Sequence, residues 1–260
     1  MGILSGIKMI ITDLDGTLLK SRNEISLFTK EVFAKLKEKN IKTAIATGRS
    51  WCYSKIYADA IGAEGAVVHN GCVVMDKGKV IYRTGLDIDT MEKVLSRSLS
   101  EIPDIKIAIE IEDDMFANFD VTRYWPGRMY IYTDFKSAPK QTAEKIVVAL
   151  PSPESREVFE RIIPDGFYIE DVEKGVCIVL RKGATKENAI KVLASKYGID
   201  MKDIAVFGDY INDIGMLKSC GIGIAMENAD PALKNVADYI CKSNENDGVA
   251  DFINTDLQLI

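Results

Sequence analysis

The chain of 260 residues is 47% hydrophobic and 28% charged, the composition of a globular protein with one or two domains. Its 33 basic and 39 acidic residues give a net charge of −6, which argues against a protein whose main task is to bind nucleic acid. The longest stretch without a charged residue, 65–75, is too short to cross a bilayer, and the five cysteines contain no CxxC pair. We therefore expect a cytoplasmic protein that binds neither nucleic acid nor a membrane.

The first third of the sequence alternates between strand and helix patterns. A short apolar run at 7–12 is typical of a buried strand, and Phe28, Val32 and Leu36 then recur four apart on one face of a predicted helix. Strands separated by helices of this length predict right-handed βαβ units and a parallel sheet. The next predicted elements are strands over 41–46 and 66–69 and a helix over 51–61.

The last third of the sequence repeats this alternation. Asp230 followed by Pro231 has the pattern of a helix N-cap with proline at the first helical position. The predicted elements are helices over 185–197, 213–219 and 248–253 and strands over 204–207, 222–225 and 238–241.

The middle of the chain has a different order, helix-strand-strand, which occurs twice. This order predicts an antiparallel sheet with helices on one face, inserted into the α/β core. The expected fold is therefore α/β, with a Rossmann-like three-layer core of residues 1–81 and 182–260 and an α+β insert at 82–181. The predicted elements of the insert are helices over 90–101 and 153–163 and strands over 105–111, 115–119, 145–150, 167–170 and 176–180.

Two carboxylates, Asp13 and Asp15, follow the first predicted strand. The period of a strand would direct both side chains the same way, and two such close charges repel unless a cation or a proton offsets them. One alternative is a plain surface turn, because Asp-Gly is a common turn dipeptide. Another is an EF-hand with Glu24 at its last position, but Leu18 stands where that loop needs glycine and a strand precedes it.

Three further segments bring polar groups to the same edge of the predicted sheet. Thr47 and Gly48 follow the second strand, where a hydroxyl and a backbone N–H suit an anion. Lys186 lies near the start of a predicted helix, where the helix dipole disfavours a cation unless a negative group lies nearby. The alternative is an ordinary lysine whose side chain is solvated. Asp209 and Asp213 follow the strand at 204–207. Because parallel sheets bind ligands at the carboxyl ends of their strands, these groups together predict Mg²⁺ beside a phosphate.

In this order the segments resemble the haloacid dehalogenase superfamily of aspartate-nucleophile phosphatases. The motifs that carry the resemblance are Asp13-Leu14-Asp15-Gly16-Thr17, Thr47-Gly48-Arg49, Lys186, and Gly208-Asp209 with Asn212-Asp213. The Cof-type branch, with its class IIB cap inserted between the second and third motifs, is matched by Asn70-Gly71, Ala225-Met226-Glu227-Asn228-Ala229, and Ser243-Asn244 with Asp247-Gly248-Val249-Ala250. Two residues depart from the family pattern. Tyr210 stands where a small residue such as Ser is common, and Glu187 stands where Gly is frequent.

The resemblance implies a role for each matched residue. Asp13 would attack phosphorus and form an aspartyl-phosphate, and Asp15 would protonate the leaving alcohol and then activate water. Mg²⁺ would be held by the carboxylates of Asp13 and Asp209 and the backbone carbonyl of Asp15, with Asp213 assisting. The phosphoryl oxygens would be held by Thr47, Lys186, Asn212 and the backbone N–H groups of Leu14 and Gly48.

The expected function is that of a Mg²⁺-dependent phosphatase for small phosphorylated metabolites, with sugar phosphates as the expected substrates. A phosphomutase of the same superfamily is the nearest alternative, and it would need a second, arginine-rich phosphate site. A non-catalytic phosphometabolite-binding protein is less favoured, because every catalytic residue type is present. The expected partner is the small-molecule substrate alone, bound by a monomer or a weak homodimer.

Overall fold

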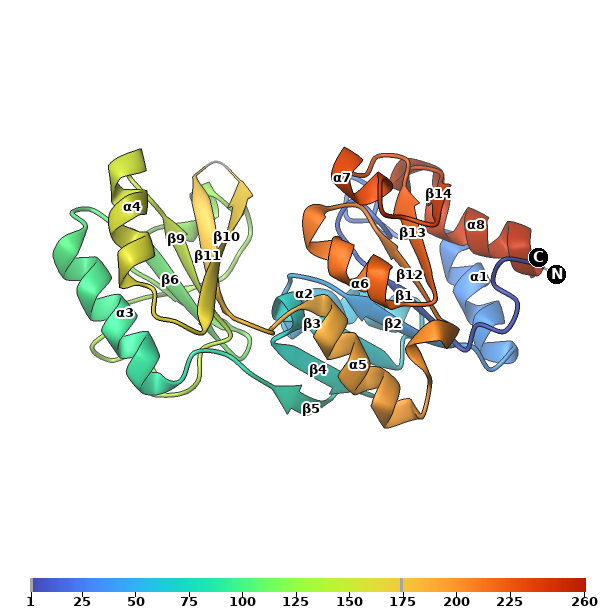
Figure 1. The fold of residues 1–260 in the computed structure, drawn as a ribbon, viewed down its shortest axis with the longest axis horizontal. Coiled ribbons are helices and arrows are strands. Elements are labelled where there is room, and N and C mark those ends of the chain that lie inside the picture. Colours follow the sequence, from blue (N-terminus) through green and yellow to red (C-terminus); the bar gives the residue numbers. More distant parts are fainter. Residues whose placement is uncertain (1, 174) are drawn as a thin grey trace. The chain divides into compact units, whose positions relative to one another are not determined.

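The computed structural model describes residues 2–173 and 175–260, which form two compact units (Figure 1). The first unit comprises Met1–Tyr82 and Thr185–Ile260, and the second comprises Arg83–Ala184. Each unit has its own sheet. The chain therefore leaves the first unit after Tyr82 and re-enters it at Thr185.

The first unit is built around an eight-stranded sheet in the order β14-β13-β12-β1-β2-β3-β4-β5. The strands from β14 to β3 pair in parallel, and β4 runs antiparallel to β3. The predicted α/β class and parallel core are thus confirmed, whereas the sequence patterns did not predict the hairpin of β4 and β5. The strands are β1 (Met9–Thr12), β2 (Lys42–Ala46), β3 (Gly65–Val68), β4 (Val73–Asp76), β5 (Lys79–Arg83), β12 (Ile204–Gly208), β13 (Ile222–Met226) and β14 (Tyr239–Cys241).

Helices cover both faces of this sheet (Figure 1). On one face α5 packs against α6, β3 and β4, and on the other α1 packs against α8 and β2. The result is the three-layer arrangement expected of a Rossmann-like core. The helices are α1 (Leu27–Glu38), α2 (Trp51–Ala60), α5 (Lys186–Tyr197), α6 (Ile214–Ser219), α7 (Pro231–Lys234) and α8 (Gly248–Leu257).

Capping residues define where two of these helices begin. The Thr185 hydroxyl accepts a hydrogen bond from the backbone N–H of Asn188 at 3.3 Å, so α5 starts at Lys186. Asp230 accepts from the backbone N–H of Ala232 at 2.7 Å, with proline at the first helical position of α7 as predicted. The cap at Thr185 is important for the site, because it places Lys186 on the first turn of α5.

The second unit is a six-stranded sheet in the order β10-β11-β9-β6-β7-β8 with two helices packed on one face. Its pairings are antiparallel except that β8 runs parallel to β7. Ile107, Ile109 and Ile111 of β6 alternate toward the helices and form a hydrophobic core with Val94 and Phe159. The elements are α3 (Ile88–Glu101), α4 (Pro153–Ile162), β6 (Lys106–Ile111), β7 (Asp114–Ala117), β8 (Ile131–Tyr132), β9 (Lys145–Ala149), β10 (Phe167–Glu173) and β11 (Val176–Arg181).

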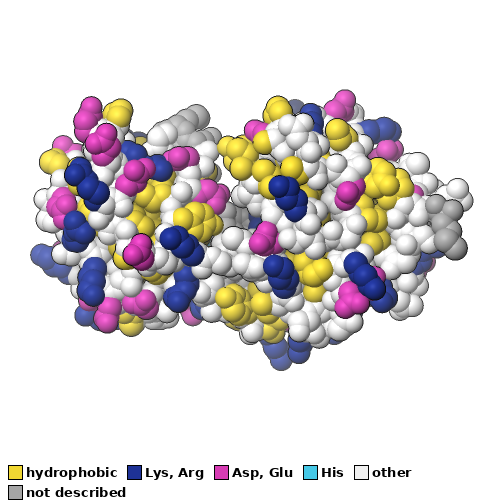
Figure 2. All heavy atoms as spheres, in the orientation of Figure 1, with side chains coloured by type: hydrophobic (Ala, Val, Ile, Leu, Met, Phe, Trp, Pro, Cys, Tyr) yellow, Lys and Arg dark blue, Asp and Glu magenta, His cyan; other side chains and the backbone are white. Residues whose placement is uncertain are grey.

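Basic and acidic side chains are interspersed over the face of the molecule shown in Figure 2. Within the described residues, no helix is both long enough and apolar enough to cross a membrane.

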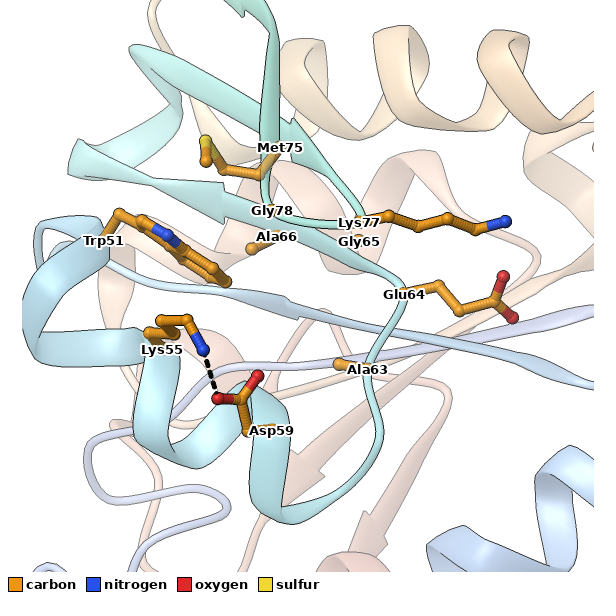
Figure 3. A pocket seen from close by; sticks show the side chains of 10 residues that line it. All are labelled: Trp51, Lys55, Asp59, Ala63, Glu64, Gly65, Ala66, Met75, Lys77 and Gly78. Atoms are coloured by element: carbon orange, nitrogen blue, oxygen red, sulfur yellow. Dashed lines mark hydrogen bonds and ion pairs between the residues drawn. The ribbon is translucent and has the colours of Figure 1, made fainter.

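A hollow of about 340 Å³ lies beside β3 and β4 in the first unit (Figure 3). The Trp51 indole and the Met75 side chain form apolar walls, and an ion pair between Lys55 and Asp59 lies at its side. None of the predicted catalytic or metal-binding residues lines it. The hollow is therefore distinct from the place where the predicted catalytic residues lie.

Candidate active site

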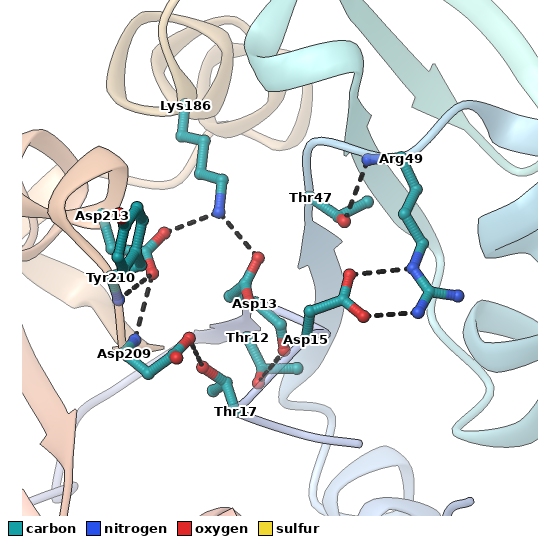
Figure 4. Close-up of polar contacts among 10 residues, drawn as sticks. All are labelled: Thr12, Asp13, Asp15, Thr17, Thr47, Arg49, Lys186, Asp209, Tyr210 and Asp213. Atoms are coloured by element: carbon teal, nitrogen blue, oxygen red, sulfur yellow. Dashed lines mark hydrogen bonds and ion pairs between the residues drawn. The ribbon is translucent and has the colours of Figure 1, made fainter. Parts of the chain in front are cut away.

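Polar side chains from three neighbouring strands meet where those strands end (Figure 4). Asp13 follows β1, Thr47 follows β2, and Asp209 follows β12. Since β1 pairs with β2 on one side and with β12 on the other, the three carboxyl ends lie side by side. The ladder extends through Asp13, whose backbone N–H donates to the carbonyl of Phe207 at 3.0 Å. The sheet topology thus brings these predicted residues to one edge.

Lys186, on the first turn of α5, brings a positive charge to this edge of the sheet. Its Nζ lies 2.7 Å from Oδ1 of Asp13 and 2.6 Å from Oδ1 of Asp213, and the residue is only 3% exposed. Asp213 ends the short helical turn η4 (Ile211–Asp213) and is itself buried. These two carboxylates supply the negative charge that a buried lysine on the first turn of a helix requires.

Burial and mutual charge shift the pKa of each of these groups. Desolvation raises the pKa of Asp13 well above its ordinary value; the charge of Lys186 opposes this, and the charges of Asp213 and Asp209 add to it. Burial lowers the pKa of Lys186, but Asp13 and Asp213 outweigh burial and raise it, so the ammonium stays charged. Burial raises the pKa of Asp209 to about 6, against a hydrogen bond from Thr17 and with a further rise from Asp213.

Asp209 is enclosed by the loop that follows Asp13. The hydroxyl of Thr17 donates to Oδ1 of Asp209 at 2.9 Å. Gly16 has φ +74°, and a Cβ there would lie 2.2 Å from Oδ2 of Asp209, so glycine is needed both for the conformation and for the close approach. On the other side, Oδ2 of Asp213 accepts from the backbone N–H groups of Asp209 and Tyr210 at 3.1 and 3.3 Å.

The acidic cluster has the chemistry of a site for a hard divalent cation. Carboxylate oxygens of Asp13, Asp209 and Asp213 lie within 4.8 Å of one another. When all three carboxyl groups are ionised, the single ammonium of Lys186 leaves two negative charges without a counter-charge. Oxygen ligands of this kind suit Mg²⁺ or Ca²⁺ and not the softer transition metals. The residues therefore fit the predicted cation in ligand type and in charge.

Asp15 lies apart from this cluster and pairs with Arg49. The guanidinium donates from Nε to Oδ2 of Asp15 at 2.8 Å and from Nη2 to Oδ1, and Nη2 also donates to Oδ1 of Asn23 at 2.7 Å. Because β1 ends at Thr12, the alternation of a strand does not govern Asp15, and the two carboxylates have different partners. The Asp15 side chain is 57% exposed. The motif resemblance implied no role for Arg49, although this residue lies in the same motif as Thr47.

The other predicted phosphate-binding residues lie in the segments that follow β1, β2 and β12. Thr47 is buried, and its hydroxyl accepts from the backbone N–H of Arg49 at 3.2 Å. Leu14 is buried next to Asp13, and Asn212 lies half-buried in η4. Gly48 lies against the carboxamide of Asn70, where a Cβ on the glycine would be 3.1 Å from Oδ1.

A strained turn joins the Thr47 segment to the start of α5. His69, Asn70 and Gly71 have consecutive positive φ angles of 51°, 60° and 104°. The backbone N–H of Asn70 donates to the carbonyl of Thr47 at 3.1 Å, and a Cβ on Gly71 would lie 2.3 Å from the carbonyl oxygen of Thr185. Such conformations are retained where the surrounding structure requires them. Here the turn fixes Thr47 relative to the residue that caps α5 just before Lys186.

Comparison with known proteins places this arrangement in a family. The family model of haloacid dehalogenase-like hydrolases matches residues 10–253. Phosphoglycolate phosphatase of Methanobrevibacter smithii is 26% identical over 250 residues, which is 95% of this chain and 97% of the relative. The 5-amino-6-(5-phospho-D-ribitylamino)uracil phosphatase YitU of Bacillus subtilis is 28% identical over 263 residues, covering 94% and 96%. A solved structure described as a sugar phosphatase of HAD subclass IIB has a TM-score of 0.82 at 22% identity, covering 97% of this chain and 100% of that one.

Proposed function

Since this chain belongs to the haloacid dehalogenase-like hydrolase family and is a phosphatase like its curated relatives, we propose that it hydrolyses phosphate esters of small metabolites, with sugar phosphates among them, through an aspartyl-phosphate intermediate. The observation that carries this proposal is the contact between the Asp13 carboxylate and the Lys186 ammonium at 2.7 Å, beside two further carboxylates. A buried, charge-stabilised carboxylate at a strand end is suited to nucleophilic attack.

Asp13 is the proposed nucleophile. One of its carboxylate oxygens forms the bond to phosphorus while the bond from phosphorus to the leaving-group oxygen breaks. Lys186 favours the ionised, nucleophilic form of Asp13 against the effect of burial. Lys186, Thr47, Asn212 and the backbone N–H groups of Leu14 and Gly48 are proposed to hold the other phosphoryl oxygens, as the resemblance implies. Phosphoryl transfer needs little beyond this positioning and charge stabilisation.

Asp15 is the proposed acid and base. It gives a proton to the leaving alcohol in the first step and takes one from the water that hydrolyses the aspartyl-phosphate in the second. Arg49 binds both carboxylate oxygens of Asp15, so the Asp15 side chain must leave the guanidinium to reach the leaving alcohol.

Asp13, Asp209 and the backbone carbonyl of Asp15 are proposed to hold Mg²⁺, with Asp213 assisting. The bound ion would offset the charge of these carboxylates and of the phosphoryl oxygens. We propose further that residues 82–181 serve as the cap and select the leaving group.

The proposal is tested by measuring phosphate release from p-nitrophenyl phosphate, a set of sugar phosphates and phosphoglycolate. Wild-type protein is expected to release free phosphate with Mg²⁺ and to lose this activity in EDTA. Asp13→Asn is expected to abolish turnover while the protein remains folded, whereas Asp200→Asn, at an exposed carboxylate of the same unit, is expected to behave as the wild type. Retention of a tenth of kcat in Asp13→Asn, a barrier change of only about 1.4 kcal/mol, would remove Asp13 from the nucleophile role. An isomerised substrate without free phosphate would indicate a phosphomutase.

A further inference from the structure

Two asparagines from the C-terminal part of the first unit support the loop that follows Asp15. Nδ2 of Asn228 donates to the carbonyl of Gly16 at 2.7 Å, and its Oδ1 accepts from the backbone N–H of Asn244 at 3.1 Å. Nδ2 of Asn244 in turn donates to the carbonyl of Leu19 at 2.8 Å. The two carboxamides thus hold both ends of the segment 16–19, and each holds it by a backbone carbonyl.

The inner side of the same segment touches Asp209. Thr17 donates to Oδ1 of Asp209 at 2.9 Å, and the Cα of Gly16 is so close that a Cβ would overlap Oδ2. The carbonyl that Asn228 binds and the nitrogen of Thr17 belong to one peptide group, which is planar and moves as a unit. A single rigid peptide group therefore lies between the Asn228 carboxamide and the residues that touch Asp209.

We infer that Asn228 and Asn244 are positioning residues for the metal site, an inference that rests on the proposed role of Asp209. Neither asparagine touches a carboxylate of the cluster in any contact that the structure records for the described residues. Both act through the segment 16–19, which sets where the Asp209 carboxylate can lie. Mg²⁺ requires nearly octahedral geometry with bonds of about 2.0–2.1 Å, so a small shift of one ligand weakens its binding. Partners of metal ligands typically contribute about 10–100-fold to metal affinity.

A purely structural role makes a different prediction. If the asparagines only fasten the segments after β13 and β14 to the rest of the unit, their loss lowers Tm and leaves the affinity of the folded protein for Mg²⁺ unchanged. If they position Asp209, the affinity falls in protein that is still folded. Metal binding measured without substrate separates the two roles.

The test compares Asn228→Ala and Asn244→Ala with Asn246→Ala in the full chain. Asn246 lies in the same C-terminal segment, and among the described residues the recorded hydrogen bond of its carboxamide goes to Ser243. We expect Asn228→Ala to raise the Mg²⁺ dissociation constant, measured by calorimetry, by about 10-fold. Asn244→Ala keeps the backbone N–H that holds Asn228, so its effect should be smaller. Asn246→Ala should bind Mg²⁺ as the wild type does.

Hydrogen exchange of the metal-free protein gives a second readout. Backbone amides in 16–20 are expected to exchange faster in Asn228→Ala than in the wild type or in Asn246→Ala. A folded Asn228→Ala variant with wild-type Mg²⁺ affinity would overturn the inference, whatever its exchange rates. If Asn228→Ala does not fold, Asn244→Ala decides by the same criteria. Wild-type protein that binds no Mg²⁺ would instead refute the proposed metal site. Faster exchange in Asn228→Ala would then show only that Asn228 holds the segment 16–20 in place.

Discussion

The Lys186 ammonium lies 2.7 Å from the Asp13 carboxylate although the two residues are 173 positions apart in the sequence. The contact depends on two unrelated features, the end of β1 and the capped start of α5. It is sealed from solvent, and the same ammonium also binds Asp213 at 2.6 Å. Lys186 therefore holds together two carboxylates that would otherwise repel each other in a buried place.

Replacement of Lys186 should destabilise the protein as well as inactivate it. Lys186→Met leaves the buried Asp13 and Asp213 without their counter-charge, and breaking such a pair costs about 3–5 kcal/mol. We expect a loss of that order in the free energy of unfolding of metal-free protein, measured with urea. Lys191→Met, at an exposed lysine of the same helix, is the matched control and should change stability little. Equal stability of the two variants would contradict the account of this contact.

Asp209 should make the stability of metal-free protein depend on pH. Burial raises its pKa to about 6 in the folded chain from an ordinary value of 3.8, so between these values the folded state holds more protons than the unfolded state. The contribution of Asp209 to stability therefore increases as pH falls from about 6 toward 4. Asp209→Asn should be more stable than the wild type at pH 7 without Mg²⁺, and this difference should shrink toward pH 4. Urea denaturation across this range measures it, and a constant difference would contradict the assignment.

The cysteines should differ sharply in reactivity. Burial raises the pKa of Cys177 to about 11 and the pKa values of Cys220 and Cys241 to about 12, so few of these thiols are ionised at pH 8. Cys52 is exposed. A chromogenic aryl disulfide should therefore react rapidly with one thiol per native chain, and Cys52→Ser should remove the rapid phase. A rapid phase that persists in this variant would contradict the burial of the other thiols.

We expect the second unit to determine which substrates are hydrolysed and to have little effect on metal binding. A chain in which a Gly/Ser linker replaces residues 83–184 keeps every proposed catalytic and metal-binding residue. If it folds, which circular dichroism and thermal denaturation establish first, we expect it to bind Mg²⁺ and a phosphate mimic. It should lose the wild-type ranking of phosphate esters, because the proposed phosphate site binds a group that all substrates share. An unchanged ranking in the folded variant would place specificity in the first unit.

The alternation of strands and helices was predictable from local apolar patterns. Which side chains a helix buries, and where a hairpin forms, were harder to predict. In α1 the structure buries Val32 and Leu36 as expected, together with Phe33, whereas Phe28 is only half-buried. At about 100° per residue, the buried stripe of Thr29, Val32, Phe33 and Leu36 is centred between Val32 and Phe33, and Phe28 lies on the far side of Val32 from that centre. The β4–β5 hairpin, joined by the short turn Lys77-Gly78, had a recognisable turn signal that the helix-strand alternation masked.

The common edge of the strand-end carboxylates was predictable for a topological reason, whereas the contacts made by the loops around them were not. The order of βαβ units alone brings Asp13 and Asp209 to one edge. The pairing of Asp15 with Arg49 depends on where β1 ends and on side-chain directions in a loop. The contact of Asn228 with Gly16 joins loops 212 positions apart, which no local pattern encodes.

The aspartyl-phosphate at Asp13 is the central claim, and Asp15→Asn with p-nitrophenyl phosphate tests it most directly. p-Nitrophenolate leaves without a proton, so loss of the proposed acid spares the first step, while loss of the proposed base slows hydrolysis of the intermediate. The account predicts a stoichiometric burst of p-nitrophenolate, and acid quenching should leave phosphate on the peptide that contains Asp13. The double variant Asp13→Asn with Asp15→Asn should show neither. Steady turnover by folded Asp15→Asn protein with no burst and no phosphate on Asp13 would contradict the claim.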